Sequence, residues 1–235
     1  MLTPPSPRIA GPPRAHWTPA VLQDCPYGVL VCATCPGEVP ANVLDGLHLR
    51  EREHASTLPE GRSREWIGGR LCLAAALASV PALRVPLLPL PSGAPAVPEG
   101  HVGSISHKGP LALALAAKGA GGIGIDVECM EISDEGLADR VLTSAERSTL
   151  GRIDSGAGFI ATTYFAAKEA IYKAMPAREQ PAIDFEHIEL VSPLRRAGES
   201  NDWMTTDARV SGRNRGVRVA VFLDGDWVIA AARRK

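Results

Sequence analysis

The sequence predicts an α+β fold of two similar, pseudo-twofold-related lobes, each with a small antiparallel sheet packed on helices. Two observations point to this class. Each half of the chain contains a helical pattern, and each also contains strand-like runs that pair around a tight turn. A chain of 235 residues, with 45% hydrophobic and 22% charged residues, is long enough for one large domain or two small ones. We expect the active site in the cleft between the lobes.

The first half opens with a proline-rich segment, which predicts a flexible N-terminus over residues 1–20. The N-terminal lobe is expected over residues 21–118. A second proline-rich stretch, residues 85–100, ends the long helix and predicts an extended loop. The expected elements, in order, are a strand over 28–34, a helix over 63–80, and two strands over 101–106 and 111–117 that flank a turn.

The second half predicts a C-terminal lobe over residues 119–235. Asp224-Gly225 is a strong turn signal between two apolar runs, so the chain is expected to close with a hairpin. The expected elements before it are a strand over 123–128 and helices over 144–152 and 158–174.

Charge and composition exclude several classes of protein. The formal net charge of −1 gives no global attraction to nucleic acid or anionic membranes. No apolar run reaches the roughly 20 residues of a membrane helix, and the N-terminus lacks the apolar core of a secretory signal. The five cysteines are an odd number without framework spacing, and nothing completes Cys32-x-x-Cys35 as a metal site. We therefore expect reduced thiols and a cytoplasmic protein.

Asp126-Val127-Glu128 is the first candidate for chemistry. Side chains alternate along a strand, so Asp126 and Glu128 share a face, with Cα atoms about 6.6 Å apart. Two carboxylates flanked by apolar residues repel unless water or a cation meets them, and Mg2+ prefers one or two carboxylates together with substrate phosphate oxygens. A strand end with two solvated acids remains the alternative.

The helix over 159–174 carries the second candidate. Lys168 and Glu169 are adjacent, and Lys173 follows Glu169 by four residues on the same helix face. An ordinary solvated ion pair is the alternative. Tyr164 and Ile171 belong to the apolar stripe that is expected to pack inward.

Thr143-Ser144-Ala145-Glu146 fits a capping box, with Thr143 as N-cap and Glu146 returning to its backbone amide. This structural role and a catalytic role for Glu146 carry similar weight.

A basic group forms the third candidate. Arg62, Trp66 and Arg70 are spaced by four along the first long helix, and two guanidinium groups at that spacing suit a phosphate. His107, at the end of Gly103-Ser104-Ile105-Ser106-His107, adds a third donor on an expected turn. Solvation of a helix face and local bonding of a turn histidine are the alternatives.

Four motifs in order resemble the 4'-phosphopantetheinyl transferase superfamily, in its monomeric two-lobed class of enterobactin- and surfactin-type enzymes. They are GSISHK (103–108), IGIDVE (123–128), LTSAERSTL (142–150) and YFAAKEAIYKA (164–174). The resemblance implies transfer of phosphopantetheine from coenzyme A to a serine of acyl or peptidyl carrier proteins, or of carrier domains of polyketide and nonribosomal peptide synthases, with release of 3',5'-ADP.

The same resemblance implies residue roles. Asp126, Glu128 and Glu169 match the magnesium ligands, and Glu169 is also the candidate general base. Lys173 and Lys168 match groups that neutralise the pyrophosphate. The groups that hold the 3'-phosphate of coenzyme A correspond to Arg62, Arg70 and His107.

The chain departs from the family pattern at three places. Residues 92–98 lack the basic residue that many members carry before the Ser-His turn. Lys108 replaces a frequent cysteine, and Phe165 stands where many relatives have tryptophan.

Two other functions remain open from the residues alone. A magnesium-dependent hydrolase or nucleotidyltransferase would use the same acidic cluster without a protein acceptor. A non-catalytic coenzyme A-binding protein would tolerate alanine at Glu169. We expect a monomer, because two lobes in one chain supply both halves of the cleft. We also expect it to bind neither nucleic acid nor membrane.

Overall fold

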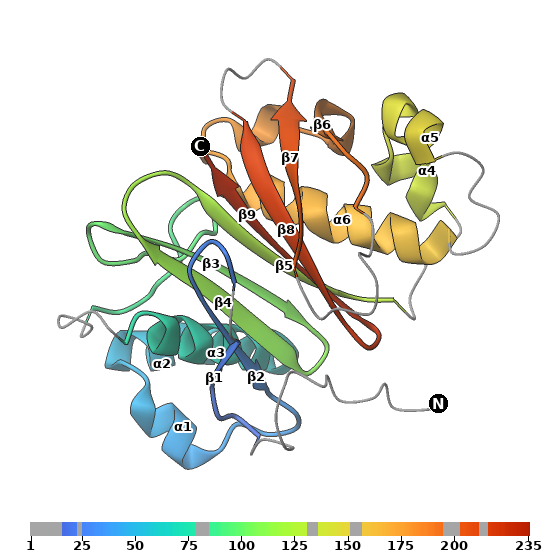
Figure 1. Cartoon of the computed structure of the whole chain (residues 1–235). Helices are drawn as coiled ribbons and strands as arrows, with labels where there is room; N and C mark the ends of the chain where they lie inside the picture. The colour runs from blue at the N-terminus through green and yellow to red at the C-terminus, as the bar shows by residue number, and fades with distance from the viewer. Residues whose placement is uncertain are drawn as a thin grey trace. The chain divides into compact units, whose positions relative to one another are not determined.

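The computed structural model describes residues 16–22, 25–78, 85–130, 136–150, 157–194, 203–211 and 216–235. These residues form two compact units, one ending at Ala120 and the other beginning at Gly121. Each unit is an antiparallel sheet packed on helices, so the predicted α+β class is confirmed (Figure 1). None of the helices in the described ranges is long and apolar enough to cross a membrane.

The N-terminal unit contains a four-stranded sheet of order β1-β2-β4-β3. The strands are β1 (Ala20–Leu22), β2 (Val29–Thr34), β3 (His101–Lys108) and β4 (Leu111–Lys118), and the helices are α1 (Ala41–Gly46), α2 (Leu49–Ser56) and α3 (Glu60–Ala76). The long helix α3 packs against β2, β3 and β4 (Figure 1). Residues 85–100 contain no helix or strand, as the prolines predict.

Two adjacent glycines bring α3 close to this sheet. A Cβ at Gly68 would lie 2.8 Å from Cys35 Sγ, and one at Gly69 would lie 2.6 Å from Ile105 Cγ2. Any larger residue would push the helix away from the strands, and this close packing outweighs the low helix propensity of glycine.

The beginning of this unit differs from the prediction. Residues 1–15 of the expected flexible N-terminus lie outside the described residues. Trp17 is buried, its indole N–H donates to the Pro36 carbonyl at 3.2 Å, and Ala20 already begins β1. The chain from Trp17 onward is therefore part of the folded unit.

The C-terminal unit contains a five-stranded sheet of order β5-β9-β8-β7-β6. Its strands are β5 (Ile123–Cys129), β6 (Ile188–Leu190), β7 (Met204–Val210), β8 (Val217–Asp224) and β9 (Trp227–Arg234), and Asp224-Gly225 lies in the predicted hairpin between the last two. The helices are α4 (Leu137–Val141), α5 (Ser144–Leu150), α6 (Ala157–Ala174) and the short 3-10 turns η1 (Gln180–Ala182) and η2 (Phe185–His187). The core lies between α6 and the apolar face of the sheet.

Candidate active site

The predicted acidic strand β5 lies directly against α6. Gly122 and Gly124 precede Asp126 at alternate positions, so all three share one face of the strand. A Cβ at Gly122 would lie 1.7 Å from the Ala174 carbonyl oxygen, and one at Gly124 would lie 1.8 Å from that of Ala170. Only glycine allows this approach, which brings the polar residues of α6 next to Asp126.

Lys173 joins the helix to the strand. Its ammonium lies 2.6 Å from Asp126 Oδ1 and donates to the Ile125 carbonyl at 3.2 Å. Asp126 is buried, whereas the Lys173 side chain is 30% exposed. The pair is thus a bridge between β5 and α6, while Lys173 also acts electrostatically on Glu169.

Glu169 is electrostatically coupled to both strand carboxylates. Its pKa is raised first by burial and then by the negative charge of Asp126, while Lys173 opposes the rise and Glu128 adds to it. Asp126 and Glu128 therefore both act electrostatically on Glu169. No group of three such ligands has metal-binding geometry within the described part of the chain.

A pocket of about 200 Å³ opens beside Glu169 in the C-terminal unit. Its walls are mostly apolar, with a carboxylate at Glu169 and another at Asp184. The aromatic ring of Phe185 meets that of Phe165 edge-on, with centroids 5.4 Å apart, which holds this wall in place. The lining residues are Glu169, Tyr172, Ile183, Asp184, Phe185 and Ile188.

The N-terminal unit brings Arg62 and His107 together. Arg62 Nη1 lies 2.5 Å from His107 Nε2, and Glu65 approaches both side chains. His107 lies near the end of β3 and not on the predicted turn. The arrangement presents a guanidinium and an imidazole on one surface, which suits an anion.

Comparisons with known proteins decide the family. The model of the 4'-phosphopantetheinyl transferase N-terminal domain matches residues 50–117, and that of the 4'-phosphopantetheinyl transferase superfamily matches residues 122–232. The chain is 34% identical over 188 residues to the 4'-phosphopantetheinyl transferase Npt of Nocardia iowensis, across 78% of this chain and 84% of that protein. The chain belongs to the 4'-phosphopantetheinyl transferase superfamily.

Two other relatives of this superfamily extend over shorter regions. The 4'-phosphopantetheinyl transferase Svp of Streptomyces mobaraensis is 31% identical, across 65% of this chain and 64% of its own length. Enterobactin synthase component D of Salmonella typhi is 30% identical, across 57% of each chain. The two family models match one structural unit each, over residues 50–117 and 122–232. The resemblance therefore covers nearly all of the chain beyond residue 50.

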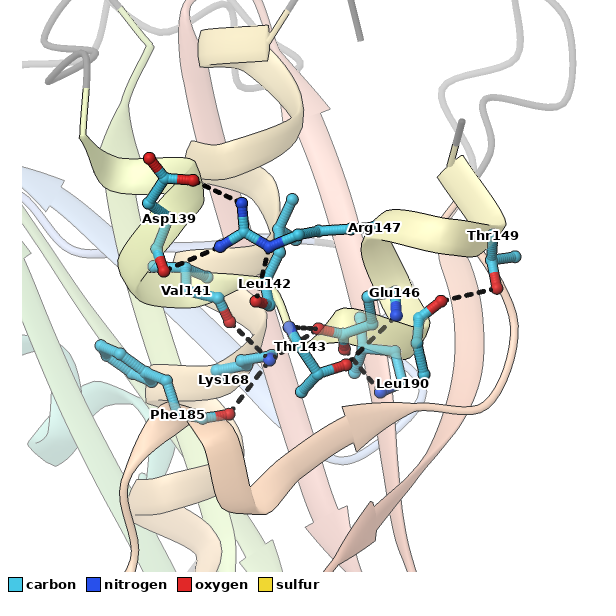
Figure 2. Close-up of polar contacts among 11 residues, drawn as sticks. Asp139, Val141, Leu142, Thr143, Glu146, Arg147, Thr149, Lys168, Phe185 and Leu190 are labelled. Atoms are coloured by element: carbon cyan, nitrogen blue, oxygen red, sulfur yellow. Dashed lines mark hydrogen bonds and ion pairs between the residues drawn. The ribbon is translucent and has the colours of Figure 1, made fainter. Parts of the chain in front are cut away.

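One predicted phosphate contact of this superfamily member needs correction. Lys168 is fully buried, and its ammonium donates to the Val141 carbonyl at 2.7 Å, to Glu146 Oε2 at 2.8 Å and to the Phe185 carbonyl at 3.1 Å (Figure 2). An ammonium has three protons, and these three acceptors use all of them. Lys168 therefore holds the fold together and does not face the pyrophosphate.

Glu146, left open between capping and catalysis, has a structural role. Its Oε2 accepts from the Thr143 amide at 2.8 Å, and Thr143 Oγ1 accepts from the Glu146 amide at 3.1 Å, which completes the predicted capping box (Figure 2). Its Oε1 accepts from the Leu190 amide at 2.9 Å. The buried carboxylate of Glu146 thus connects the start of α5 to strand β6 and, through Lys168, to helix α6.

The predicted contact of Arg70 with the 3'-phosphate of coenzyme A also needs correction. Its Nε donates to the Leu87 carbonyl at 2.5 Å, and its guanidinium stacks on the Trp66 ring, 4.4 Å from the centroid. Only 6% of the residue is exposed, and burial lowers its pKa to about 10. The spacing of four correctly placed Arg70 near Trp66, but on the inner side of α3.

Two glutamates of the N-terminal unit were not singled out from the sequence. Glu65 contacts Arg62 and His107, and Glu51 is a buried cap residue whose Oε1 accepts from the Leu87 amide at 2.8 Å. A signal for Glu65 existed, because it lies three residues after Arg62 on the same helix. The sequence gives no such signal for Glu51, because its N-cap partner is His48 and not serine or threonine.

Proposed function

We propose that this chain transfers the 4'-phosphopantetheine group of coenzyme A to a serine of an acyl or peptidyl carrier protein and releases 3',5'-ADP. The observation that carries the proposal is the convergence of Asp126 with Lys173 and the coupled Glu169 on adjoining faces of β5 and α6. Phosphoryl transfer depends on positioning and on neutralising charge, which acidic residues with a metal and a neighbouring lysine supply.

We propose Mg2+ as the metal, held by Asp126, Glu128 and Glu169. The fit rests on donor chemistry: three carboxylates supply the hard oxygen ligands that magnesium prefers, and Asp126 and Glu128 both add negative charge at Glu169. Bound there, the metal would neutralise phosphate oxygens of the donor.

The side chains divide the remaining work. Glu169, whose pKa is raised above its ordinary value by burial, accepts the proton of the serine hydroxyl as the serine oxygen forms a bond to the phosphopantetheine phosphorus. The bond from that phosphorus to the oxygen of the departing 3',5'-ADP breaks with its electron pair. The ammonium of Lys173 lies beside Asp126 and lowers the cost of negative charge on the phosphates.

Intact-mass analysis of an apo carrier protein, incubated with this chain, coenzyme A and magnesium chloride, tests the reaction. The carrier is expected to gain one phosphopantetheinyl group, and EDTA or Glu169→Gln is expected to reduce the rate at least about 100-fold. Glu53→Gln is the matched control, because Glu53 is an exposed carboxylate on α2.

Failure of every carrier to gain mass, despite binding of coenzyme A, would favour a non-catalytic binding protein. Breakdown of coenzyme A without an acceptor would favour a magnesium-dependent hydrolase.

We also propose that the protein works as a monomer in the cytoplasm, where carrier domains of polyketide, nonribosomal peptide or fatty-acid synthesis are its partners. None of the five cysteines, all within the described ranges, forms a disulfide, which suits a reducing compartment. Light scattering is expected to give a mass near 24.8 kDa, and a stable trimer would contradict the proposal.

A further inference from the structure

Glu65 lies within the basic group that is proposed to bind the 3'-phosphate of coenzyme A. Its Oε2 is 3.1 Å from Arg62 Nη1 and 3.5 Å from His107 Nδ1. The contact of 2.5 Å between Arg62 Nη1 and His107 Nε2 requires Nε2 to accept, which assigns the imidazole proton to Nδ1, on the side of Glu65. Glu65 Oε2 therefore faces two groups, the guanidinium of Arg62 and the Nδ1–H of His107.

This carboxylate occupies donors that an anionic ligand would use. Arg62 and Glu65 are one helical turn apart on α3, so the glutamate can turn away by side-chain rotation without a change in the helix. The side chains of Arg62, Glu65 and His107 are 54%, 32% and 26% exposed. Exposed ion pairs of this kind contribute little stability, so a more highly charged ligand can replace the carboxylate.

We propose that Glu65 determines specificity at this site, as an internal counter-ion that a phosphate dianion displaces and that a carboxylate or other monoanion does not. The proposal rests on the proposed function, because it takes Arg62 and His107 as the 3'-phosphate site. A dianion gains more from the guanidinium than Glu65 does, and arginine can hold two of its oxygens at once. A monoanion offers no more charge than the carboxylate already present.

Calorimetric titration of the full chain tests this with two ligands that cannot react. One is 3',5'-ADP, and the other is 5'-AMP, which lacks the 3'-phosphate. Glu65→Gln keeps the size and removes the charge, so it is expected to bind 3',5'-ADP about threefold to tenfold more tightly than the wild type, with binding of 5'-AMP unchanged. Acetate is expected to compete with 3',5'-ADP in Glu65→Gln and only weakly in the wild type.

Two controls separate the possible results. Glu53→Gln removes an exposed charge elsewhere on the same unit and is expected to change neither affinity. Arg62→Gln is expected to remove the preference for 3',5'-ADP over 5'-AMP.

Equal or weaker binding of 3',5'-ADP by Glu65→Gln would overturn the proposal and leave the transfer reaction standing. A wild type that does not prefer 3',5'-ADP over 5'-AMP would show that the basic group is not the phosphate site. That result would also overturn the role of Glu65, while the mass gain of the carrier still decides the reaction.

Discussion

The two units share a polar feature, of which the sequence predicts only the C-terminal example. Each has a short helix whose N3 residue is a buried glutamate in a capping box. Glu51 Oε2 accepts from the His48 amide at 2.9 Å, and Glu146 Oε2 accepts from the Thr143 amide at 2.8 Å. In both units the other carboxylate oxygen accepts from a leucine amide much later in the chain. One glutamate in each unit therefore starts a helix and fixes a distant segment to it.

The units differ in the cation beside that glutamate. In the C-terminal unit Lys168 pairs directly with Glu146, and both side chains are almost wholly buried. In the N-terminal unit Arg70 donates to the Leu87 carbonyl and stacks on the Trp66 ring. A lysine ammonium is a point charge that needs a close anion, whereas the broad guanidinium distributes its charge over a ring face and a carbonyl. Removal of the glutamate carboxylate should therefore destabilise the C-terminal unit far more than the N-terminal unit.

Glu146→Ala is expected to have the largest effect. It leaves the buried ammonium of Lys168 without its anion and the Leu190 amide without its acceptor, which should cost about 3–5 kcal/mol of unfolding free energy. Hydrogen exchange read separately in each unit during urea titration measures the loss. A loss below about 1 kcal/mol would mean that the pair contributes little.

Glu51→Ala is expected to cost less, about 1–3 kcal/mol, in the N-terminal unit. The Leu87 amide loses its acceptor, but Arg70 keeps both the carbonyl and the aromatic ring. The same hydrogen-exchange measurement applies, with Glu53→Ala as the exposed control within about 0.5 kcal/mol of the wild type. A loss equal to that of Glu146→Ala would remove the difference between the units.

The smallest expected effect is a pH dependence confined to the C-terminal unit. Burial lowers the pKa of Lys168 below its ordinary 10.5, and Glu146 opposes this lowering, so Glu146→Gln should lower it further. Between that lowered pKa and 10.5 the unfolded chain binds more protons than the folded chain, so the unfolding free energy rises with pH. The deficit in unfolding free energy of Glu146→Gln relative to the wild type should therefore narrow as the pH rises toward 10.5.

Glu51→Gln is the matched comparison for this titration. Glu51 raises the pKa of Arg70 only against a starting value of 12.5, so the deficit in unfolding free energy of Glu51→Gln should narrow less with pH than that of Glu146→Gln. A deficit that narrows equally in both variants would contradict the assignment to Lys168.

Much of the fold was predictable because it depends on local patterns. The alternation in β5, the periodicity of α6 and the turn at Asp224-Gly225 each specify an element within a few residues. The helix predicted over 63–80 instead begins at Glu60, directly after Pro59, and ends at Ala76. The three-residue strands β1 and β6 were missed, since their partners and not their own pattern define them.

The candidate site was predicted less completely because it depends on tertiary contacts. Alternation placed Asp126 and Glu128 on one face, but only the packing at Gly122 and Gly124 brings Lys173 to Asp126. A signal for Lys168 was present: it lies four residues after Tyr164, on the stripe that packs inward. A lysine on an apolar stripe indicates a buried partner, which here is Glu146.

The glutamate contacts also set when each long loop can close during synthesis. Glu51 and Leu87 are 36 residues apart, and Glu146 and Leu190 are 44 residues apart. Closing the longer loop costs only about 0.2 kcal/mol more, so neither unit has an entropic advantage. On a ribosome the first loop can close once Leu87 has emerged, before any of the C-terminal unit has been made. The second must wait for Leu190, and β9, the sheet partner of the acidic strand β5, is synthesised later still.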